Sequence, residues 1–310
     1  MKKILIIGAN GFTGRQILND LSVHTQYKVT GCSLHPDILP NDAGKYRFIE
    51  TDIRNEANIK RLFEEVQPDV VINCSALSVP DYCETHHEEA YLTNVTAVSQ
   101  LAVFCEKYKS RFIHLSTDFV FDGKMFVFDE KINEDAGLLY TEEDIPAPVN
   151  YYGYTKWKGE EKVAETCSSY AIVRVAIVYG RALPGQHGNI VQLVMNRLKA
   201  GQEIRVVSDQ WRTPTYVGDV SDGVQRLIAH PTNGIFHICG VECMSIAEIA
   251  YQVADYMGLD HSLIHPVTTE EMNETTPRPR FSGMSIDKAR TMLGYKPQKL
   301  KEVLANWEHL

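Results

Sequence analysis

The chain has 310 residues, of which 44% are hydrophobic, and a formal net charge of -9. This length suffices for one large domain or two modest ones, and the acidic balance argues against nucleic acid or an anionic membrane surface as the main partner. No apolar stretch approaches the roughly 18 residues of a membrane span. The seven cysteines include no Cys-x-x-Cys pair, so reduced thiols in a cytoplasmic protein are expected.

Strand-like and helix-like segments alternate along the first half of the chain. Residues 3–8 form a continuous apolar run, which is typical of a central parallel strand covered on both faces. Further strands are predicted at 28–33, 47–51, 69–75, 111–117 and 170–180, and helices at 12–21, 55–66, 88–107 and 150–166. This alternation predicts right-handed β-α-β units and a doubly wound α/β fold with a parallel, Rossmann-type sheet.

After Gly180 the elements become shorter and are interrupted by glycines and prolines. A strand is still predicted at 234–240, and a helix at 245–257 that begins with a capping box of Ser245 and Glu248. We expect a dinucleotide-binding domain of residues 1–178 plus about 216–238, and a smaller C-terminal α/β substrate-binding domain of about 179–215 plus 239–310. Ligands of open α/β sheets bind at the carboxyl ends of the strands, which predicts a site between these domains.

A glycine-rich segment follows the first predicted strand and opens the first predicted helix. Its glycines recur at every third position, and such glycines let the backbone approach a pyrophosphate whose charge the helix N-terminus stabilises. The pattern therefore predicts a bound nicotinamide dinucleotide. Its expected contacts in this segment are Gly8, Asn10, Gly11, Phe12, Thr13 and Gly14.

The end of the second strand bears on which dinucleotide binds. A carboxylate there would hold the ribose 2′-hydroxyl, but the chain reads Gly31-Cys32-Ser33-Leu34-His35. Ser33 and His35 suit a 2′-phosphate, which favours NADP(H) and leaves NAD(H) open. Asp52, with its neighbour Ile53, is placed to meet the adenine, although an N-cap of the helix 55–66 is an equally good role for Asp52.

Tyrosine and lysine at a Tyr-x-x-x-Lys spacing indicate chemistry on a ketone. A carbonyl oxygen that receives a hydride needs an acid beside it, and a tyrosine serves if a nearby ammonium lowers its pKa from about 10. A helix puts both groups on one face. The chain has the spacing at Tyr152/Lys156, Tyr154/Lys158 and Tyr295/Lys299.

Two of these three Tyr-Lys pairs are compatible with a position inside a helix. The third is discarded because Lys296-Pro297 cannot lie inside a helix. The first two pairs lie on one predicted helix, about 200° apart around its axis, so only one of them can face a cofactor. The spacing alone leaves both open.

Four motifs resemble the extended short-chain dehydrogenase/reductases, and within them the dTDP-4-dehydrorhamnose reductase family. Residues 116–123, STDFVFDG, are similar to the family's STDYVFDG, and residues 152–160 match its YGxTKxxGE. Asp209-Gln210 with Pro214-Thr215 matches DQxxxPT, and residues 278–282 match RPxxS. The motifs follow the family order over nearly the whole chain.

The resemblance implies NAD(P)H-dependent reduction of the 4-keto group of a nucleotide-linked deoxysugar, with dTDP-4-dehydrorhamnose as the expected substrate and dTDP-rhamnose as the product. It selects Tyr152 as the acid and Lys156 as the contact to the nicotinamide ribose. It adds Thr117, whose hydroxyl would hold the substrate carbonyl oxygen.

The resemblance also implies further contacts. The loop Ser75, Ala76 and Leu77 would lie along the cofactor. Asn94 would complete the cofactor site from behind, and a satisfied core asparagine is an equally good interpretation. The candidates for substrate binding are Asp118, Phe119, Asn189 and Arg278, and the last two fit capping or surface roles equally well.

Departures from the family fall on the substrate side. Phe119 stands where tyrosine is usual, and residues 124–139 look like an insertion, either a lid or a solvated loop. An epimerase stays open, whereas a dehydratase is disfavoured because Phe119 replaces the glutamate of the dehydratase motif. A non-catalytic dinucleotide-binding regulatory subunit, resembling the methionine adenosyltransferase β subunit, also stays open. A homodimer is the other partner that stays open. Residues 86–89, His-His-Glu-Glu, are expected to form a solvated helix face, so no metal is predicted.

Overall fold

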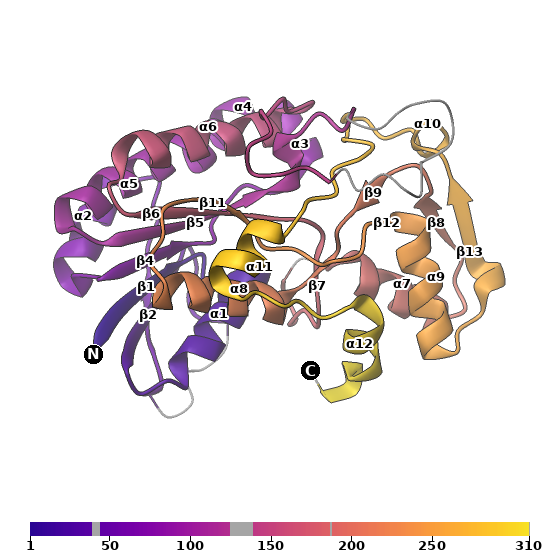
Figure 1. Cartoon of the computed structure of the whole chain (residues 1–310), viewed down its shortest axis with the longest axis horizontal. Coiled ribbons are helices and arrows are strands. Elements are labelled where there is room, and N and C mark those ends of the chain that lie inside the picture. Colours follow the sequence, from indigo (N-terminus) through magenta and orange to yellow (C-terminus); the bar gives the residue numbers. More distant parts are fainter. Residues whose placement is uncertain (39–43, 125–138, 187, 310) are drawn as a thin grey trace.

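A computed structural model describes residues 1–38, 44–124, 139–186 and 188–309 (Figure 1). In that part of the chain, seven strands form a parallel sheet in the order β11-β6-β5-β4-β1-β2-β3. The predicted doubly wound sheet is therefore confirmed. Its strands are β1 (Lys2–Ile7), β2 (Tyr27–Ser33), β3 (Arg47–Glu50), β4 (Val70–Asn73), β5 (Arg111–Thr117), β6 (Tyr170–Val175) and β11 (Gly234–His237).

Helices cover both faces of the sheet, which explains why its strands are apolar throughout. Ile4 and Ile6 of β1 belong to the core under one helical layer, whereas Leu5 and Ile7 belong to the core under the other. Successive side chains of a strand point to opposite faces, so a strand covered on both sides must be apolar at every position. The first layer contains α1 (Phe12–Ser22), α8 (Val217–Ala229) and α11 (Asp287–Leu293), and the second α2 (Glu56–Val66), α5 (Ala97–Tyr108) and α6 (Tyr151–Thr166) (Figure 1).

The sequence predicted one strand over residues 170–180, but the structure has two separate strands there. β6 ends at Val175, and β7 (Val178–Tyr179) leaves the sheet to pair with β10 (Thr215–Tyr216). Between them, Ile177 has φ 37°, a backbone conformation that β-branched residues rarely adopt. The chain turns here from the central sheet toward the second lobe.

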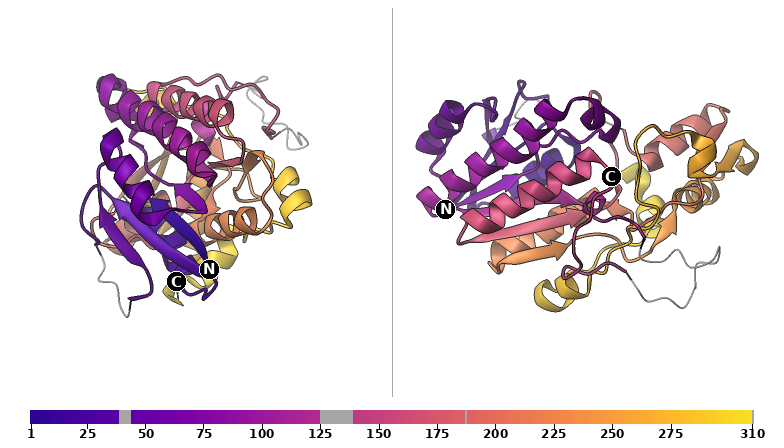
Figure 2. Two further views of the ribbon diagram at one scale, coloured as in Figure 1. Left: turned by 90° about the vertical axis from the view of Figure 1, so that its left-hand side faces the viewer. Right: turned by 90° about the horizontal axis from the view of Figure 1, so that it is seen from above.

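The second lobe has its own apolar core and lies beyond the carboxyl ends of the strands (Figure 2). Its α9 begins with the predicted capping box of Ser245 and Glu248. The domain limits stay a prediction. Helix α11 lies in the segment expected to belong to the second domain, but it packs on α8 and β11 of the first. The remaining elements are α3 (Pro80–Thr85), α4 (His87–Tyr91), α7 (Ile190–Lys199), β8 (Ile204–Val207), β9 (Trp211–Arg212), β12 (Met244–Ser245), α9 (Ile246–Met257), β13 (Ile264–Val267), α10 (Thr269–Met272) and α12 (Leu300–Ala305).

Two general properties agree with the sequence. All seven cysteines are free thiols, as predicted. Among the described residues, no helix combines the length and apolarity needed to cross a bilayer.

Candidate active site

The glycine-rich loop joins β1 to α1 and forms a cradle for a pyrophosphate. Gly8 has φ 79°, and a Cβ there would lie 2.7 Å from the backbone nitrogen of Ser75. A Cβ on Gly14 would collide with the carbonyl oxygen of Gly8. Gly11 caps α1 without a side-chain hydrogen bond, so the first-turn amides around Phe12 and Thr13 are available to an anion. These residues fit the predicted dinucleotide.

Asn10 fastens this loop to the end of β2. Its backbone N–H donates to Ser33 Oγ at 3.0 Å, and its side-chain amide donates to the carbonyl of Pro36 at 2.8 Å. Its Oδ1 accepts a hydrogen bond from Arg15, which is buried and paired with Asp37. Neither charge was predicted from the sequence: Arg15 is a cation beside the expected 2′-phosphate position, and Asp37 is the carboxylate that follows β2.

Asp52 follows β3, where the adenine was expected. Its carboxylate accepts hydrogen bonds from the backbone N–H and the guanidinium of Arg54, which lower the pKa of Asp52. The alternative role as an N-cap is wrong, because Asn55 caps α2 by accepting from the N–H of Ala57 at 2.9 Å. Contact between adenine and Asp52, with the buried Ile53 beside it, stays a prediction.

Asn94 lies in a π-helical turn, Leu92–Thr96, that interrupts the predicted helix 88–107 between α4 and α5. Its Oδ1 accepts from the N–H of Leu77 at 2.9 Å, and its Nδ2 donates to the carbonyl of Leu77 and to Thr155 Oγ1, both at 3.0 Å. Asn94 is fully buried and both of its donors are used. Asn94 therefore fits the alternative interpretation of a satisfied core asparagine and holds the loop of Ser75, Ala76 and Leu77 in place, while its contact with the cofactor stays a prediction.

The candidate catalytic side chains meet where β5 ends and α6 begins. Thr117 is the last residue of β5, and Tyr152 and Lys156 lie one turn apart in α6, which Asn150 caps by accepting from the N–H of Gly153. Tyr154 is 36% exposed. Lys158 pairs with Glu161 and lies over the Trp157 ring. The geometry thus separates the two Tyr-x-x-x-Lys pairs and turns only Tyr152/Lys156 toward β5.

The pKa values of Tyr152 and Lys156 differ from those of a free tyrosine and a free lysine. Partial burial raises the pKa of Tyr152, against a smaller lowering from its hydrogen bond with Thr117. Lys156 Nζ donates to the carbonyl of Leu115 at 2.7 Å, and burial lowers the pKa of Lys156 to about 8. In the chain alone, the pKa of Tyr152 is therefore raised and not lowered. A high pKa keeps the hydroxyl of Tyr152 protonated near neutral pH, as a proton donor requires.

Asp118 is satisfied by protein partners, and its predicted contact with a substrate gains no support from the structure. Only 2% of its surface is exposed, and its carboxylate accepts from Thr117, from Ser282 and from the Arg212 guanidinium at 3.2 Å. Arg212 also donates to the carbonyl of Pro279. Asp118 and Arg212 therefore tie the segment 279–282 to the catalytic end of β5. Arg212 was missed because it occupies a variable position of the DQxxxPT motif.

The other predicted substrate-binding residues, Asn189, Arg278 and Phe119, differ in their contacts. Asn189 caps α7, with Oδ1 accepting from Gln192 and Nδ2 donating to Gly180, which is the capping role that the sequence also allowed; its substrate contact stays a prediction. Arg278 is partly exposed and pairs with Glu274 at 3.1 Å and with Asp81 of α3 at 3.5 Å. Its role, and that of Phe119, whose ring lies 5.6 Å from that of Tyr152, stay predictions. Within the proposed insertion, residues 125–138 lie outside the described residues.

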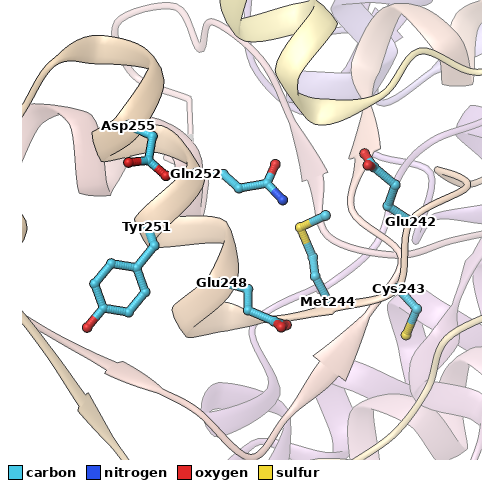
Figure 3. A pocket seen from close by; sticks show the side chains of 7 residues that line it. All are labelled: Glu242, Cys243, Met244, Glu248, Tyr251, Gln252 and Asp255. Carbon is cyan, nitrogen blue, oxygen red and sulfur yellow. The ribbon is translucent and has the colours of Figure 1, made fainter. Parts of the chain in front are cut away.

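A hollow of about 510 Å³ lies away from these residues, in the second lobe (Figure 3). It is lined by Glu242, Cys243, Met244, Glu248, Tyr251, Gln252 and Asp255. Its three carboxylates and the absence of any candidate catalytic residue from its lining argue against a site for an anionic nucleotide.

The histidines near α4 are engaged with aromatic rings. His86 stacks on Tyr82 and His87 on Tyr151, each with ring centres 3.7 Å apart. In the described parts of the chain, no group of three or more His, Cys, Asp or Glu side chains is arranged to hold a metal ion.

A buried ion pair holds the catalytic helix on the sheet. Glu160, one turn beyond Lys156, accepts two hydrogen bonds from Arg174 of β6, at 3.0 and 2.6 Å, and both side chains are at most 4% exposed. We expect Glu160→Gln to lower the free energy of unfolding by about 3–5 kcal/mol, because a buried guanidinium loses its counter-charge. Urea unfolding checks this. Glu165→Gln, which removes an exposed pair with Lys162, is the control, and an equal effect of both changes would contradict the prediction.

The cradle for a dinucleotide and the Thr-Tyr-Lys set at the end of a parallel strand define an extended short-chain dehydrogenase/reductase. The chain belongs to the RmlD substrate binding domain family, which matches residues 1–308. Spore coat polysaccharide biosynthesis protein SpsK of Bacillus subtilis is 30% identical to it, over 99% of this chain and 97% of SpsK. Methionine adenosyltransferase 2 subunit beta of Xenopus laevis is 31% identical, over 94% of this chain and 82% of that protein.

Solved structures share the whole architecture. A dTDP-4-dehydrorhamnose reductase from Clostridium acetobutylicum is 31% identical with a TM-score of 0.84, over 99% of this chain and 98% of its own. The dTDP-4-dehydrorhamnose reductase of Bacillus anthracis, solved with NADP, is 27% identical with a TM-score of 0.82, over 100% of this chain and 99% of its own. The resemblance stated from the sequence motifs is confirmed at the level of the family.

Proposed function

We propose that the protein is an NAD(P)H-dependent reductase of the 4-keto group of a nucleotide-linked deoxysugar. NADP(H) is the preferred cofactor and NAD(H) an alternative, and dTDP-4-dehydrorhamnose is the first candidate substrate. The observation that carries the proposal is that Thr117, Tyr152 and Lys156 meet at the carboxyl end of β5, the same edge of the parallel sheet as the glycine cradle that follows β1. The NADP-bound reductase of Bacillus anthracis supports the cofactor.

The chain supplies binding, orientation and a proton. The reduced nicotinamide, when bound, supplies the hydride. Tyr152 donates to the carbonyl oxygen and gives it a proton as the alcohol forms. Thr117 donates to Asp118 in this structure, so its hydroxyl must turn from Asp118 to the carbonyl oxygen when substrate binds. The charge of Lys156 stabilises the tyrosine anion that remains. The glycine cradle and the first turn of α1 hold the pyrophosphate.

The loss of NADPH absorbance on addition of dTDP-4-dehydro-β-L-rhamnose tests this function, with NADH measured in parallel. We expect catalytic decay with NADPH and slower decay with NADH. Tight NADPH binding without decay, for this ketosugar and for its relatives with other nucleotides, would contradict the proposed reaction.

A regulatory role is the second candidate, because the methionine adenosyltransferase 2 subunit beta of Xenopus laevis is as similar to this chain as the solved reductase from Clostridium acetobutylicum, at 31% identity. Purification from native lysate distinguishes the two, since a regulatory subunit should co-purify with a stoichiometric partner enzyme. The epimerase alternative has no such support, because the solved UDP-glucose 4-epimerases are 23% and 20% identical and show the fold alone. A homodimer and a cytoplasmic location stay predictions.

A further inference from the structure

A histidine in the middle of β5 lies between the strand β4 and the catalytic lysine. His114 is fully buried; its Nδ1 is 3.1 Å from Asn73 Nδ2, and its Nε2 is 3.4 Å from Lys156 Nζ. The reaction outlined above gives this side chain no task. The hydrogen bonds around it determine which of its two ring nitrogens carries the proton.

The orientation of the Asn73 amide is decided by Ser75. The backbone N–H of Ser75 lies 3.1 Å from one terminal atom of Asn73, and the Ser75 hydroxyl lies 2.7 Å from the same atom. A backbone N–H can only donate, so that atom must be the carbonyl oxygen Oδ1. The other terminal atom, Nδ2, then faces His114 and must donate to it.

The tautomer of His114 follows from this donation. Because Nδ1 accepts a hydrogen bond from Asn73, it carries no proton. Burial lowers the pKa of His114 well below its usual range, and the neighbouring Lys156 lowers it further, so the ring is neutral. Its one proton therefore lies on Nε2, the nitrogen that faces Lys156.

We propose that His114 is a positioning residue that presents Nε2–H to Lys156 Nζ, disfavours the ammonium form of this lysine, and thereby adds to burial in lowering the pH at which Lys156 loses its charge. An ammonium group has three donors and no acceptor, so an N–H that points at it is repelled. A neutral amine has a lone pair that accepts this N–H, while its own N–H still donates to the carbonyl of Leu115.

The other groups around Lys156 do not substitute for His114. Glu160 favours the ammonium, but its charge is paired with Arg174. Cys74, after β4, is an uncharged thiol because burial raises its pKa to about 12. Tyr152, one turn back, is protonated. Among the described residues, His114 is the neutral donor aimed at this lysine. The importance of this inference for the reaction rests on the proposed role of Lys156. The two tests below do not depend on that role.

The first test reads the tautomer in the full wild-type chain. In ¹⁵N-histidine-labelled protein, long-range ¹H–¹⁵N correlation spectra distinguish Nε2–H from Nδ1–H, and the His114 signals are those missing from His114→Asn. We expect the Nε2–H form throughout the range where the protein is folded. An Nδ1–H form, or a ring that becomes charged near neutral pH, would overturn the proposal, and if His114→Asn does not fold, triple-resonance assignment of the wild-type chain identifies the His114 signals instead.

The second test reads Lys156 directly. In protein labelled with ¹³C at lysine Cε, the Lys156 signal is the one absent from Lys156→Met, and its midpoint is followed with pH. Asparagine keeps an acceptor near the place of Nδ1 but has no group at Nε2, so we expect His114→Asn to raise the midpoint by about half a pH unit or more, about a threefold change in the acid dissociation constant. His237→Asn is the control, because His237 is equally buried, lies in β11 and bonds Ser285 instead.

An unchanged or lower midpoint in folded His114→Asn would overturn the proposal, and so would an equal rise in His237→Asn. Neither measurement uses a sugar substrate. A protein that shows the expected tautomer and midpoint shift but reduces no ketosugar would contradict the proposed function and leave this inference standing. If turnover is found, its alkaline limb should move up in pH with the Lys156 midpoint.

Discussion

Tyr152→Phe should lower kcat by about 10²–10⁴-fold, the usual contribution of a positioned general acid. The change removes only a hydroxyl, so the ring contact with Phe119 remains. The dissociation constant of NADPH should therefore change little, because the glycine cradle and α1 hold the pyrophosphate. Steady-state reduction of the ketosugar and NADPH fluorescence titration measure the two effects separately.

Tyr154→Phe is the matched control for this prediction. Tyr154 lies two residues further along the same helix, is more exposed and has the same spacing to a lysine. We expect turnover close to that of the wild type. A large loss in Tyr154→Phe with little loss in Tyr152→Phe would mean that the other pair faces the cofactor and that the proposed acid is the wrong tyrosine.

Gly14→Ala should raise the dissociation constant of NADPH by about 10–100-fold, which corresponds to the usual cost of overpacking a tight site. The new Cβ would meet the carbonyl oxygen of Gly8, and this backbone atom cannot rotate away as a side chain would. The loop and the start of α1 must separate, which moves the amides that face the pyrophosphate. Fluorescence titration with NADPH measures the loss.

Gly188→Ala provides the control for steric effects of an added methyl group. Gly188 is exposed, and a Cβ there would meet no heavy atom within 4 Å. NADPH binding should stay at the wild-type level in this variant. Wild-type affinity in Gly14→Ala would show that the loop does not form the pyrophosphate site.

Local patterns were enough to predict the sheet, the cradle and the two candidate Tyr-Lys pairs. An uninterrupted apolar run such as β1 indicates a strand that is buried on both faces of the sheet, because successive residues of a strand point to opposite faces. Glycines at a fixed spacing report a tight turn, because only glycine has room at Gly8 and Gly14. Those signals are carried by neighbours in sequence, so they need no knowledge of the rest of the fold.

The side chains that surround the catalytic groups could not be predicted in this way. Asn94 and Thr155 are 61 positions apart, and Asp118 and Ser282 are 164 positions apart. Whether such a polar residue contacts a ligand or is satisfied within the protein depends on which partners the fold brings to it. For that reason the sequence left Asn94 and Asn189 open between a ligand and a protein partner, and the structure shows protein partners for both and for Asp118.

By itself, the sequence determined the class of fold, and it predicted the place of the dinucleotide and a tyrosine as the acid for the reaction. The spacing left both Tyr-Lys pairs open and the family resemblance selected Tyr152/Lys156, whereas the tertiary structure showed how this pair turns toward β5 and that the chain leaves the sheet at Ile177. Only the tertiary structure decided the hydrogen-bond chain from Ser75 through Asn73 and His114 to Lys156. The reason is physical: burial and hydrogen-bond partners assign charge and tautomer, and they come from strands that are adjacent only in the folded protein.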